Sequence, residues 1–341
     1  MNHFFKALCI LFIPVLLGAT VLPPAPLYRL CIDGGGSKTM LQVLDRRGEV
    51  MPLLQDGRVI DRVTVGGSNV NVIGEVGLRK VLEELFADVR LHDVTDQPLL
   101  FEVMPNCFLY AGMSGLGLES NKAIARNVFS SFGINPENMV VMADAEMARE
   151  YLGDNGITLI AGTGSICFGQ RDGNNYRVGG LGRVLGDEGS CYEIGLKALR
   201  AALAEEYGWG KNTSLSAALH VHVGAVELKR LIPGINAGTT PSSTLAALAP
   251  IVCEQAVAGD KIAKKIMKKT KHNLVKLVRN MIRIGGFSDT RLCCWGGLFK
   301  SVFADEIIHE IVAMAAKQGC SVTVENHAQD NLPVLYVRSR A

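Results

Sequence analysis

The sequence predicts an α/β protein with two similar lobes, and three observations lead to this prediction. Short apolar runs alternate with segments whose apolar residues recur at helical spacing, which is typical of α/β folds. A strand, a glycine–hydroxyl loop and a second strand occur in this order twice, at residues 30–44 and 157–168. With 341 residues, the chain is also long enough for two domains.

The first copy of this plan lies in YRLCIDGGGSKTMLQVLDRRG, residues 28–48. Apolar runs at 30–32 and 40–44 read as buried strands, and three consecutive glycines lie between Asp33 and Ser37. A tight hairpin needs only one or two glycines, whereas a glycine loop lets backbone N–H groups surround an anion. The stretch therefore favours a phosphate site over a plain turn.

The second copy lies at residues 157–173. An apolar strand leads into a loop of alternating glycine and hydroxyl residues: Gly162, Thr163, Gly164 and Ser165. A second apolar strand and a charged turn follow. The two copies are too far apart for a solenoid repeat, so they predict two lobes that each offer a loop to the same ligand.

The spacing of the glycines separates these loops from two common nucleotide motifs. Residues 34–39 read GGGSKT, which does not fit G-x-x-x-x-G-K-[ST], and a strand follows where the P-loop has a helix. The dinucleotide fingerprint G-x-G-x-x-G is absent there too. Two facing hairpin loops instead suit a site in which each lobe holds part of the nucleotide's phosphates.

The rest of the chain alternates strands and helices. Apolar spacing predicts helices at 75–91, 121–132, 188–207 and 261–284. Strands that run into glycine turns or helices are predicted within FLYAGMSG, MVVMADAE and TRLCCWGG. NAGTTPSS, residues 236–243, is predicted to be a flexible loop.

The composition excludes several classes of function. A net charge of +2 gives no reason to expect a nucleic-acid partner, and 48% hydrophobic residues indicate an ordinary globular protein. Nine scattered cysteines are typical of reduced, buried thiols, and the adjacent Cys293 and Cys294 suit neither a zinc knuckle nor a redox pair. The seven histidines show no metal-ligand spacing.

The N-terminal segment conflicts with the intracellular location that reduced cysteines suggest. An apolar run at 7–22, interrupted by Pro14, resembles a signal peptide or a weak anchor. We expect residues 1–29 to lie outside the fold, as an anchor, a targeting segment or the product of a start codon assigned too early. The remaining chain is expected to be cytoplasmic, because ATP is scarce outside the cell, and would contact a membrane only if the segment is a real anchor.

In their order along the chain, these motifs resemble the N-acetylglucosamine kinase and BadF/BadG/BcrA/BcrD ATPase family of the actin–hexokinase superfamily. The resemblance covers residues 30–301 and rests on DGGGSKT, GGSNVNVIG, AGMSG, ADA, AGTGS, GGLGRVLGDEGS and CWGGLFKS. It implies two RNase-H-like lobes with a nucleotide cleft between them, which we expect at 30–141 and 142–341. It also implies ATP- and Mg²⁺-dependent phosphorylation of an amino sugar, with N-acetylglucosamine or glucosamine expected.

The resemblance also implies which residues bind each part of the substrates. The ATP phosphates would lie against the two loops: Gly35, Gly36, Ser37, Lys38, Gly162, Thr163, Gly164 and Ser165. The adenosine would lie against Gly296 and Gly297. The sugar would be bound by Asn69, Gly180, Gly182 and Asp187. Without the resemblance, Asn69 also fits a turn, and Asp187 also fits a helix cap.

The chemistry needs a metal ligand and a base. Asp33 is expected to hold Mg²⁺ through water, because Mg²⁺ prefers one or two carboxylates and retained waters. A carboxylate that accepts the sugar's proton contributes typically ~10²–10⁴-fold. Animal amino-sugar kinases of the family have an aspartate where this chain has Gly117. The resemblance to related sugar kinases of the superfamily, which have their base at a strand end just before the second phosphate loop, implies that Asp144 in MADAE is the base or a metal partner. Asp144 also fits a helix N-cap, and Glu119 is kept in reserve as the base.

The sequence leaves two alternatives open. An activator whose ATPase drives electron transfer to a dehydratase or reductase would need cluster-ligating cysteines, and no convincing pair is present. A catalytically impaired sugar sensor is suggested by Gly117 and by the ending NLPVLYVRSRA, which lacks the small-residue helix usual in the family. A homodimer is compatible with either function.

Overall fold

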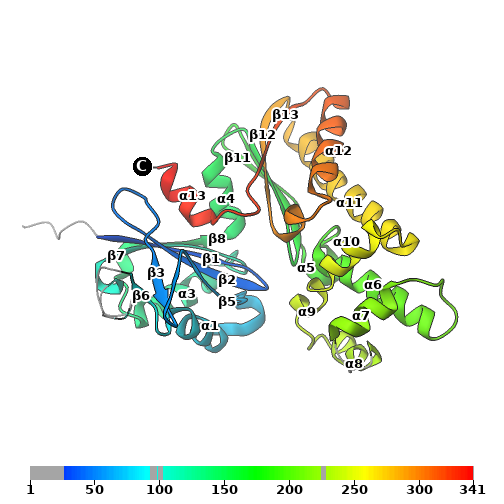
Figure 1. Ribbon diagram of the computed structural model, residues 1–341. Helices are drawn as coiled ribbons and strands as arrows, with labels where there is room; N and C mark the ends of the chain where they lie inside the picture. Colours follow the sequence, from blue (N-terminus) through cyan, green and yellow to red (C-terminus); the bar gives the residue numbers. More distant parts are fainter. Residues whose placement is uncertain (1–26, 93–97, 99–102, 224–227, 341) are drawn as a thin grey trace, which may run out of the picture.

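The computed structural model describes residues 27–92, 98, 103–223 and 228–340. Figure 1 shows two halves, each built on its own sheet. The two five-stranded sheets have the orders β5-β2-β1-β7-β8 and β11-β10-β9-β12-β13. In both, three antiparallel neighbours are followed by two parallel strands, so the duplication seen in the sequence is a duplication of topology.

The first half contains the following elements. Its large sheet consists of β1 (Tyr28–Gly34), β2 (Lys38–Leu44), β5 (Val63–Gly66), β7 (Cys107–Met113) and β8 (Met139–Ala143). A small sheet consists of β3 (Leu53–Gln55), β4 (Arg58–Ile60) and β6 (Arg90–Leu91). The helices are α1 (Val70–Phe86), α3 (Glu119–Ser131), η1 (Met104–Asn106) and η2 (Pro136–Asn138).

The second half is larger and more helical. Its sheet consists of β9 (Gly156–Ala161), β10 (Ser165–Arg171), β11 (Asn174–Gly179), β12 (Asp289–Trp295) and β13 (Ser321–Asn326). The helices are α4 (Asp144–Leu152), α5 (Gly182–Leu185), α6 (Cys191–Glu206), α7 (Leu215–Val223), α8 (Leu231–Asn236), α9 (Ser242–Ala246), α10 (Ala249–Val257), α11 (Lys261–Gly285), α12 (Ala304–Lys317) and α13 (Leu332–Arg338). Two 3-10 turns complete it: η3 (Leu228–Arg230) and η4 (Gly297–Lys300).

Each half has its own core because each sheet buries one side against amphipathic helices. In the first half, Leu78, Leu82 and Leu85 of α1 are fully buried, which the i, i+4, i+7 spacing requires. In the second half, α11 buries Leu274 and Met281 against the sheet, while its lysines lie on the other face. The predicted long amphipathic helix is therefore confirmed.

Two expected boundaries differ from the structure. The helix expected at 75–91 begins earlier, at Val70, with a kink at Gly74 (φ 62°), and ends at Phe86, because Arg90 and Leu91 form strand β6. Tyr28 and Arg29, expected to lie outside the fold, belong to β1, where they pair with β7. The apolar run at 7–22 lies outside the described residues.

The expected division after residue 141 cuts through β8, which pairs with β7 up to Ala143. The first sheet therefore extends two residues beyond the expected boundary, because Met142 and Ala143 complete its parallel edge. No helix within the described part of the chain is long and apolar enough to cross a membrane.

The last described helix lies in the segment that was expected to lack a small-residue helix, and it consists of large residues. Leu332–Arg338 form helix α13, which begins after Asn331, whose side chain accepts from the N–H of Val334 at 3.2 Å. Val334 and Val337 are buried against Cys31 and Leu44 of the first sheet. The side chains of this helix are large, and they cover the hydrophobic surface that Cys31 and Leu44 form on the first sheet. Figure 1 shows α13 beside α4, between the two halves.

Candidate active site

The two glycine–hydroxyl loops meet. The Ser37 and Thr163 hydroxyl oxygens are 2.5 Å apart, although 126 positions separate the two residues. A Cβ added at Gly36 would lie 3.4 Å from the Cβ of Thr163. The loop of each sheet therefore faces the loop of the other, as two loops must if they are to hold one ligand.

The first loop is seated on the segment that follows β5. The N–H of Gly35 donates to the Lys38 carbonyl at 2.8 Å, which closes the turn, and the N–H of Ser68 donates to the Gly35 carbonyl at 3.0 Å. A Cβ on Gly67 would lie 2.4 Å from the carbonyl oxygen of Gly36. Glycine is needed at position 67 because the two backbones are in contact.

The second loop is held by the start of α6. The N–H groups of Cys191 and Tyr192 donate to the carbonyls of Gly162 and Thr163, at 2.9 and 3.3 Å. Because the peptide unit is planar and trans, the N–H groups of Thr163 and Gly164 point away from α6. They form a pair of adjacent donors, which is what an anion site requires.

Ser165 is engaged elsewhere. Its hydroxyl donates to the Glu188 carbonyl at 2.8 Å, and its N–H donates to the Asp187 carboxylate at 3.2 Å. Its side chain therefore fixes the loop onto the segment before α6 in this structure. The hydroxyl that reaches the first loop is that of Thr163.

The two glycines of CWGGLFKS lie against the second loop. Gly296 has φ +102°, and a Cβ there would lie 2.5 Å from the carbonyl oxygen of Ala161. A Cβ on Gly162 would lie 3.8 Å from the Cα of Gly296 and from the N of Gly297. The end of β12 and the loop after β9 thus form one glycine-lined surface.

Two carboxylates lie at the carboxyl ends of neighbouring parallel strands. Asp33 is on β1, next to β7, and Asp144 directly follows β8 on the other side of β7. The pKa of Asp33 is raised to about 7, mainly by burial and also by the nearby charge of Asp144, while Lys38 and Lys300 oppose the shift. Carboxyl groups with such shifts at strand ends are typical of functional sites in α/β proteins.

Asp144 is the first residue of α4 rather than its cap, which is Ala143. Burial raises the pKa of the Asp144 carboxyl, and the N–H of Ala145, which donates to it at 2.8 Å, opposes the shift. The alternative prediction that Asp144 is a helix N-cap is therefore wrong by one position. A half-buried carboxylate with a raised pKa is suited to accept a proton from a substrate hydroxyl.

Sequence reasoning missed Lys300, at the end of η4. Burial lowers the pKa of its ammonium group, and the nearby Lys38 cation lowers it further, while Asp33 opposes the shift. Lys38 and Lys300 come from opposite halves and approach each other in spite of their like charge. An anion placed between them would relieve that repulsion. Lys300 is visible in the sequence as the lysine of CWGGLFKS, but its closeness to the first loop depends on the fold.

Asn69 caps α1 and also reaches the AGMSG turn. Its side-chain oxygen accepts from the N–H of Asn71 at 3.0 Å, and its amide donates to the Ser114 hydroxyl at 3.3 Å. Gly115 has φ +90°, and a Cβ there would lie 2.4 Å from the Asn69 oxygen. The asparagine is therefore held in place by two neighbouring motifs.

The second predicted sugar segment lies beside the second phosphate loop. Gly180 has φ +67°, and a Cβ there would lie 2.2 Å from Ile166, whereas one on Gly182 would meet nothing within 4 Å. The carboxylate of Asp187 lies 3.1 Å from the position of a Cβ on Gly164, and burial raises its pKa. Within the described part of the chain, no hydrogen bond joins this segment to Asn69.

Gly117, which occupies the position of the family aspartate, and the reserve base Glu119 both lie at the surface. Gly117 is exposed, and a Cβ there would meet nothing within 4 Å. The side chain of Glu119 is 74% exposed and pairs with Arg126 at 3.1 Å and Lys122 at 3.8 Å on its own helix. Glu119 is thus occupied in surface ion pairs.

Solved structures share this fold. A Chromobacterium violaceum protein named as a proposed N-acetylglucosamine kinase superposes with a TM-score of 0.62 at 21% identity, covering 92% of this chain and 100% of that one. A ROK family glucokinase from Streptomyces griseus superposes with a TM-score of 0.52 at 13% identity, covering 91% and 98%. At these identities the likeness concerns the fold.

Sequence relatives are closer. The chain is 29% identical over 286 residues to an N-acetylmuramic acid/N-acetylglucosamine kinase of Clostridium acetobutylicum, covering 81% of this chain and 86% of that protein. It is 28% identical over 265 residues to an N-acetyl-D-glucosamine kinase of Dictyostelium discoideum, covering 74% and 78%. A model of one family matches residues 30–329, from the first glycine loop to beyond the second. The chain belongs to the BadF/BadG/BcrA/BcrD ATPase family.

Proposed function

We propose that this protein transfers the γ-phosphoryl group of ATP to a hydroxyl group of an amino sugar. The contact between the Ser37 and Thr163 hydroxyl groups carries the proposal, because the two loops that we assign to anion binding meet there. The kinase names of the relatives that cover most of the chain support it. The sugars in the names of these relatives indicate that the acceptor is an amino sugar.

Phosphoryl transfer depends on positioning and on neutralising charge. The N–H groups of the two loops, together with Lys38 and Lys300, supply the positive side. A bound Mg²⁺ would neutralise phosphate charge, and the donor set suits it, because Asp33 and Asp144 offer hard oxygen ligands at adjacent strand ends. We assign Asp33 to that ion, through water.

Asp144 is assigned as the base. It accepts the proton of the attacking sugar hydroxyl as that oxygen bonds to the γ-phosphorus and the bond to the β–γ bridging oxygen breaks. The products are ADP and a sugar phosphate, and the proton remains on Asp144 until solvent removes it. We propose that Asn69, Gly180, Gly182 and Asp187 hold the sugar, with the glycines allowing its ring to approach the backbone.

The test is a coupled assay of ADP release by the full-length chain with Mg²⁺ and a panel of sugars. The panel holds N-acetylglucosamine, glucosamine, N-acetylmuramic acid, glucose and N-acetylgalactosamine. We expect an amino sugar to stimulate ADP release over the sugar-free rate and to yield a phosphorylated sugar. Absence of stimulation by every sugar would refute the proposal, and calorimetric sugar binding without turnover would assign a sensor instead.

We propose a cytoplasmic location, where ATP is plentiful, and fractionation of cells that express the full chain tests it. Recovery of the protein with the membranes would instead assign an anchoring role to the N-terminal segment. A dimer, proposed from the sequence, is tested by sedimentation. The activator alternative gains no support from the described cysteines, seven of which are buried. A colourless protein after anaerobic purification would exclude it.

A further inference from the structure

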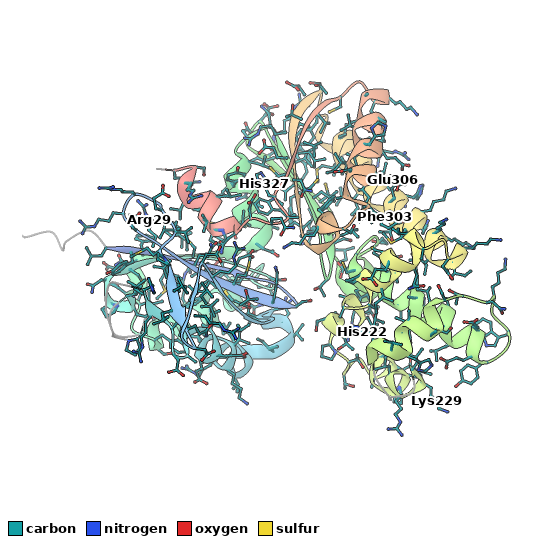
Figure 2. The ribbon with its side chains drawn as sticks, viewed as in Figure 1. Arg29, His222, Lys229, Phe303, Glu306 and His327 are labelled. Atoms are coloured by element: carbon teal, nitrogen blue, oxygen red, sulfur yellow. The ribbon has the colours of Figure 1, made fainter. Side chains whose placement is uncertain are left out.

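A cluster of metal-binding side chains lies outside the proposed active site. Cys293 of β12 and Glu325 of β13 are partners in the parallel register, and His327 follows two residues after Glu325. Because side chains alternate along a strand, the three lie on one face of the second sheet. Their ligand atoms all lie within 4.8 Å of one another. Figure 2 labels His327 beside this sheet, near α4.

From this cluster, we propose that Cys293 Sγ, Glu325 Oε2 and His327 Nε2 form a zinc site that is separate from the proposed kinase site. Sulfur, imidazole and carboxylate ligands together suit Zn²⁺, whereas Mg²⁺ and Ca²⁺ prefer oxygen alone. Three protein ligands leave the fourth tetrahedral position to water.

The distances match such a site. Glu325 Oε2 lies 3.0 Å from His327 Nε2 and 3.8 Å from Cys293 Sγ. Zinc bonds of about 2.0–2.3 Å at tetrahedral angles place neighbouring ligand atoms roughly 3.3–3.6 Å apart. The side chains therefore need only small movements to coordinate a zinc ion.

The surroundings of His327 provide an independent argument. Nδ1 of His327 lies 2.7 Å from Asp330 Oδ2, and the ring stacks on Trp295 with centroids 4.9 Å apart. A carboxylate on Nδ1 keeps a proton there, as it does for most zinc-bound histidines, so Nε2, which contacts Glu325 Oε2 in this structure, is the nitrogen that would exchange its proton for the metal. Asp330 and Trp295 thus hold the ring in the orientation that coordination needs.

The charges also balance. Arg291 makes two hydrogen bonds to Glu325, at 2.7 and 3.0 Å, so a cation is already present beside the ligands. A dication and Arg291 together carry three positive charges. The Cys293 thiolate, Glu325 and Asp330 carry three negative charges. The zinc-bound cluster is therefore neutral, which avoids leaving uncompensated charge in a partly buried site.

A zinc ion here would tie the ends of β12 and β13 together. Trp295 directly precedes Gly296, which lies against the second phosphate loop. Binding would stabilise the folded chain by mass action and raise its melting temperature.

The test uses the full-length chain without a tag, with Cys9→Ser in every protein because Cys9 lies outside the described residues. After chelator treatment, Zn²⁺ is titrated in competition with a chromophoric chelator, and Co²⁺ binding is followed by the thiolate-to-cobalt absorption band. We expect one equivalent of Zn²⁺, a thiolate band and a higher melting temperature. Asp330→Asn should weaken binding about 10- to 100-fold.

Matched variants locate the site. Cys293→Ala and His327→Gln should abolish the cobalt band or weaken zinc binding at least tenfold, while Cys294→Ala, the adjacent cysteine outside the cluster, should keep both. Replacing the buried Cys293 can disturb folding, so His327→Gln tests the same site without that replacement. Circular dichroism checks the fold of each variant. Failure to bind one equivalent, cobalt binding without the thiolate band, or equal binding by all variants would overturn the proposal and leave an ion-pair cluster.

Discussion

The hydroxyl oxygens of Ser37 and Thr163 lie 2.5 Å apart, in loops from two different sheets. No phosphate group fits between atoms at that separation. If both loops hold a triphosphate, as we propose, the loops must move apart when it enters, and nucleotide binding would then be coupled to the relative position of the two halves. This relationship makes the site testable without knowledge of the sugar.

Replacing both residues by cysteine should lock the loops together. We expect Ser37→Cys with Thr163→Cys to form a disulfide under mild oxidation, because the two side chains already touch. Oxidised protein should lose ATP binding, measured by calorimetry, and a reductant should restore it. Each single cysteine variant is the control and should be insensitive to oxidation. Undiminished ATP binding by the cross-linked protein would contradict the shared site.

Gly67→Ala should weaken ATP binding by displacing the first loop. Its Cβ would lie 2.4 Å from the carbonyl oxygen of Gly36, so the backbone must shift. We expect a KM for ATP at least several-fold higher, with less change in the KM for sugar. Gly66→Ala is the matched control, since a Cβ there meets nothing within 4 Å. Equal effects of the two alanines would argue against this packing.

Asp144→Asn should lower kcat about 10²–10⁴-fold, because an amide cannot accept the hydroxyl proton. ATP binding, measured by calorimetry, should persist. Glu119→Gln should leave kcat unchanged, because that side chain pairs with Arg126 on the surface. A fully active Asp144→Asn variant would contradict the assignment of Asp144 as the base. An inactive Glu119→Gln variant would assign the base to Glu119 instead.

Lys300→Met should raise the KM for ATP roughly 10- to 100-fold, which corresponds to a lost charge-assisted hydrogen bond of about 1.5–3 kcal/mol. Burial and, after it, the closeness of Lys38 lower the pKa of Lys300, and a bound triphosphate would oppose that shift. Lys265→Met, on the exposed face of α11, is the control. Similar KM values for both variants would remove Lys300 from the phosphate site.

Asp33 should make the nucleotide-free chain less stable as the pH rises. Its pKa is about 7 in the folded chain against 3.8 for the free side chain, mainly because of burial. The folded state therefore holds this proton more tightly, and stability from this group is lost between about pH 4 and pH 7. Asp33→Asn should melt at a higher temperature than the wild type at pH 8, with the gap closing near pH 4. The melting temperatures of both proteins are measured in the presence of a chelator. A difference between them that is the same at pH 4 and pH 8 would contradict the prediction.

The sequence predicted the duplicated plan because strand–glycine loop–strand is a local pattern. Both copies form antiparallel pairs at the centre of sheets with the same strand order. It also predicted α11 well, since 25 residues of amphipathic spacing leave little ambiguity. The start of α1 was misjudged because Gly74 interrupts the pattern with φ 62°.

The missed features depend on tertiary contacts. Lys300 faces Lys38 only because η4 follows β12 across from the first loop. Cys293 and His327 are 34 positions apart and become neighbours through the pairing of β12 with β13, so no ligand spacing is visible in the sequence. Helix α13 could not be predicted from its residues alone, because the surface that it covers belongs to β1 and β2.

Helix α13 has a consequence for how the protein is made. Cys31 and Leu44 are covered by Val334 and Val337, which the ribosome adds only after all strands of the second sheet. The first sheet can form early in translation, yet one of its apolar sides stays uncovered until the second half has been completed. Chaperones that recognise exposed apolar surface are therefore expected to bind the nascent chain there. Ribosomes stalled before residue 332 should show that association, and release should follow once α13 has emerged.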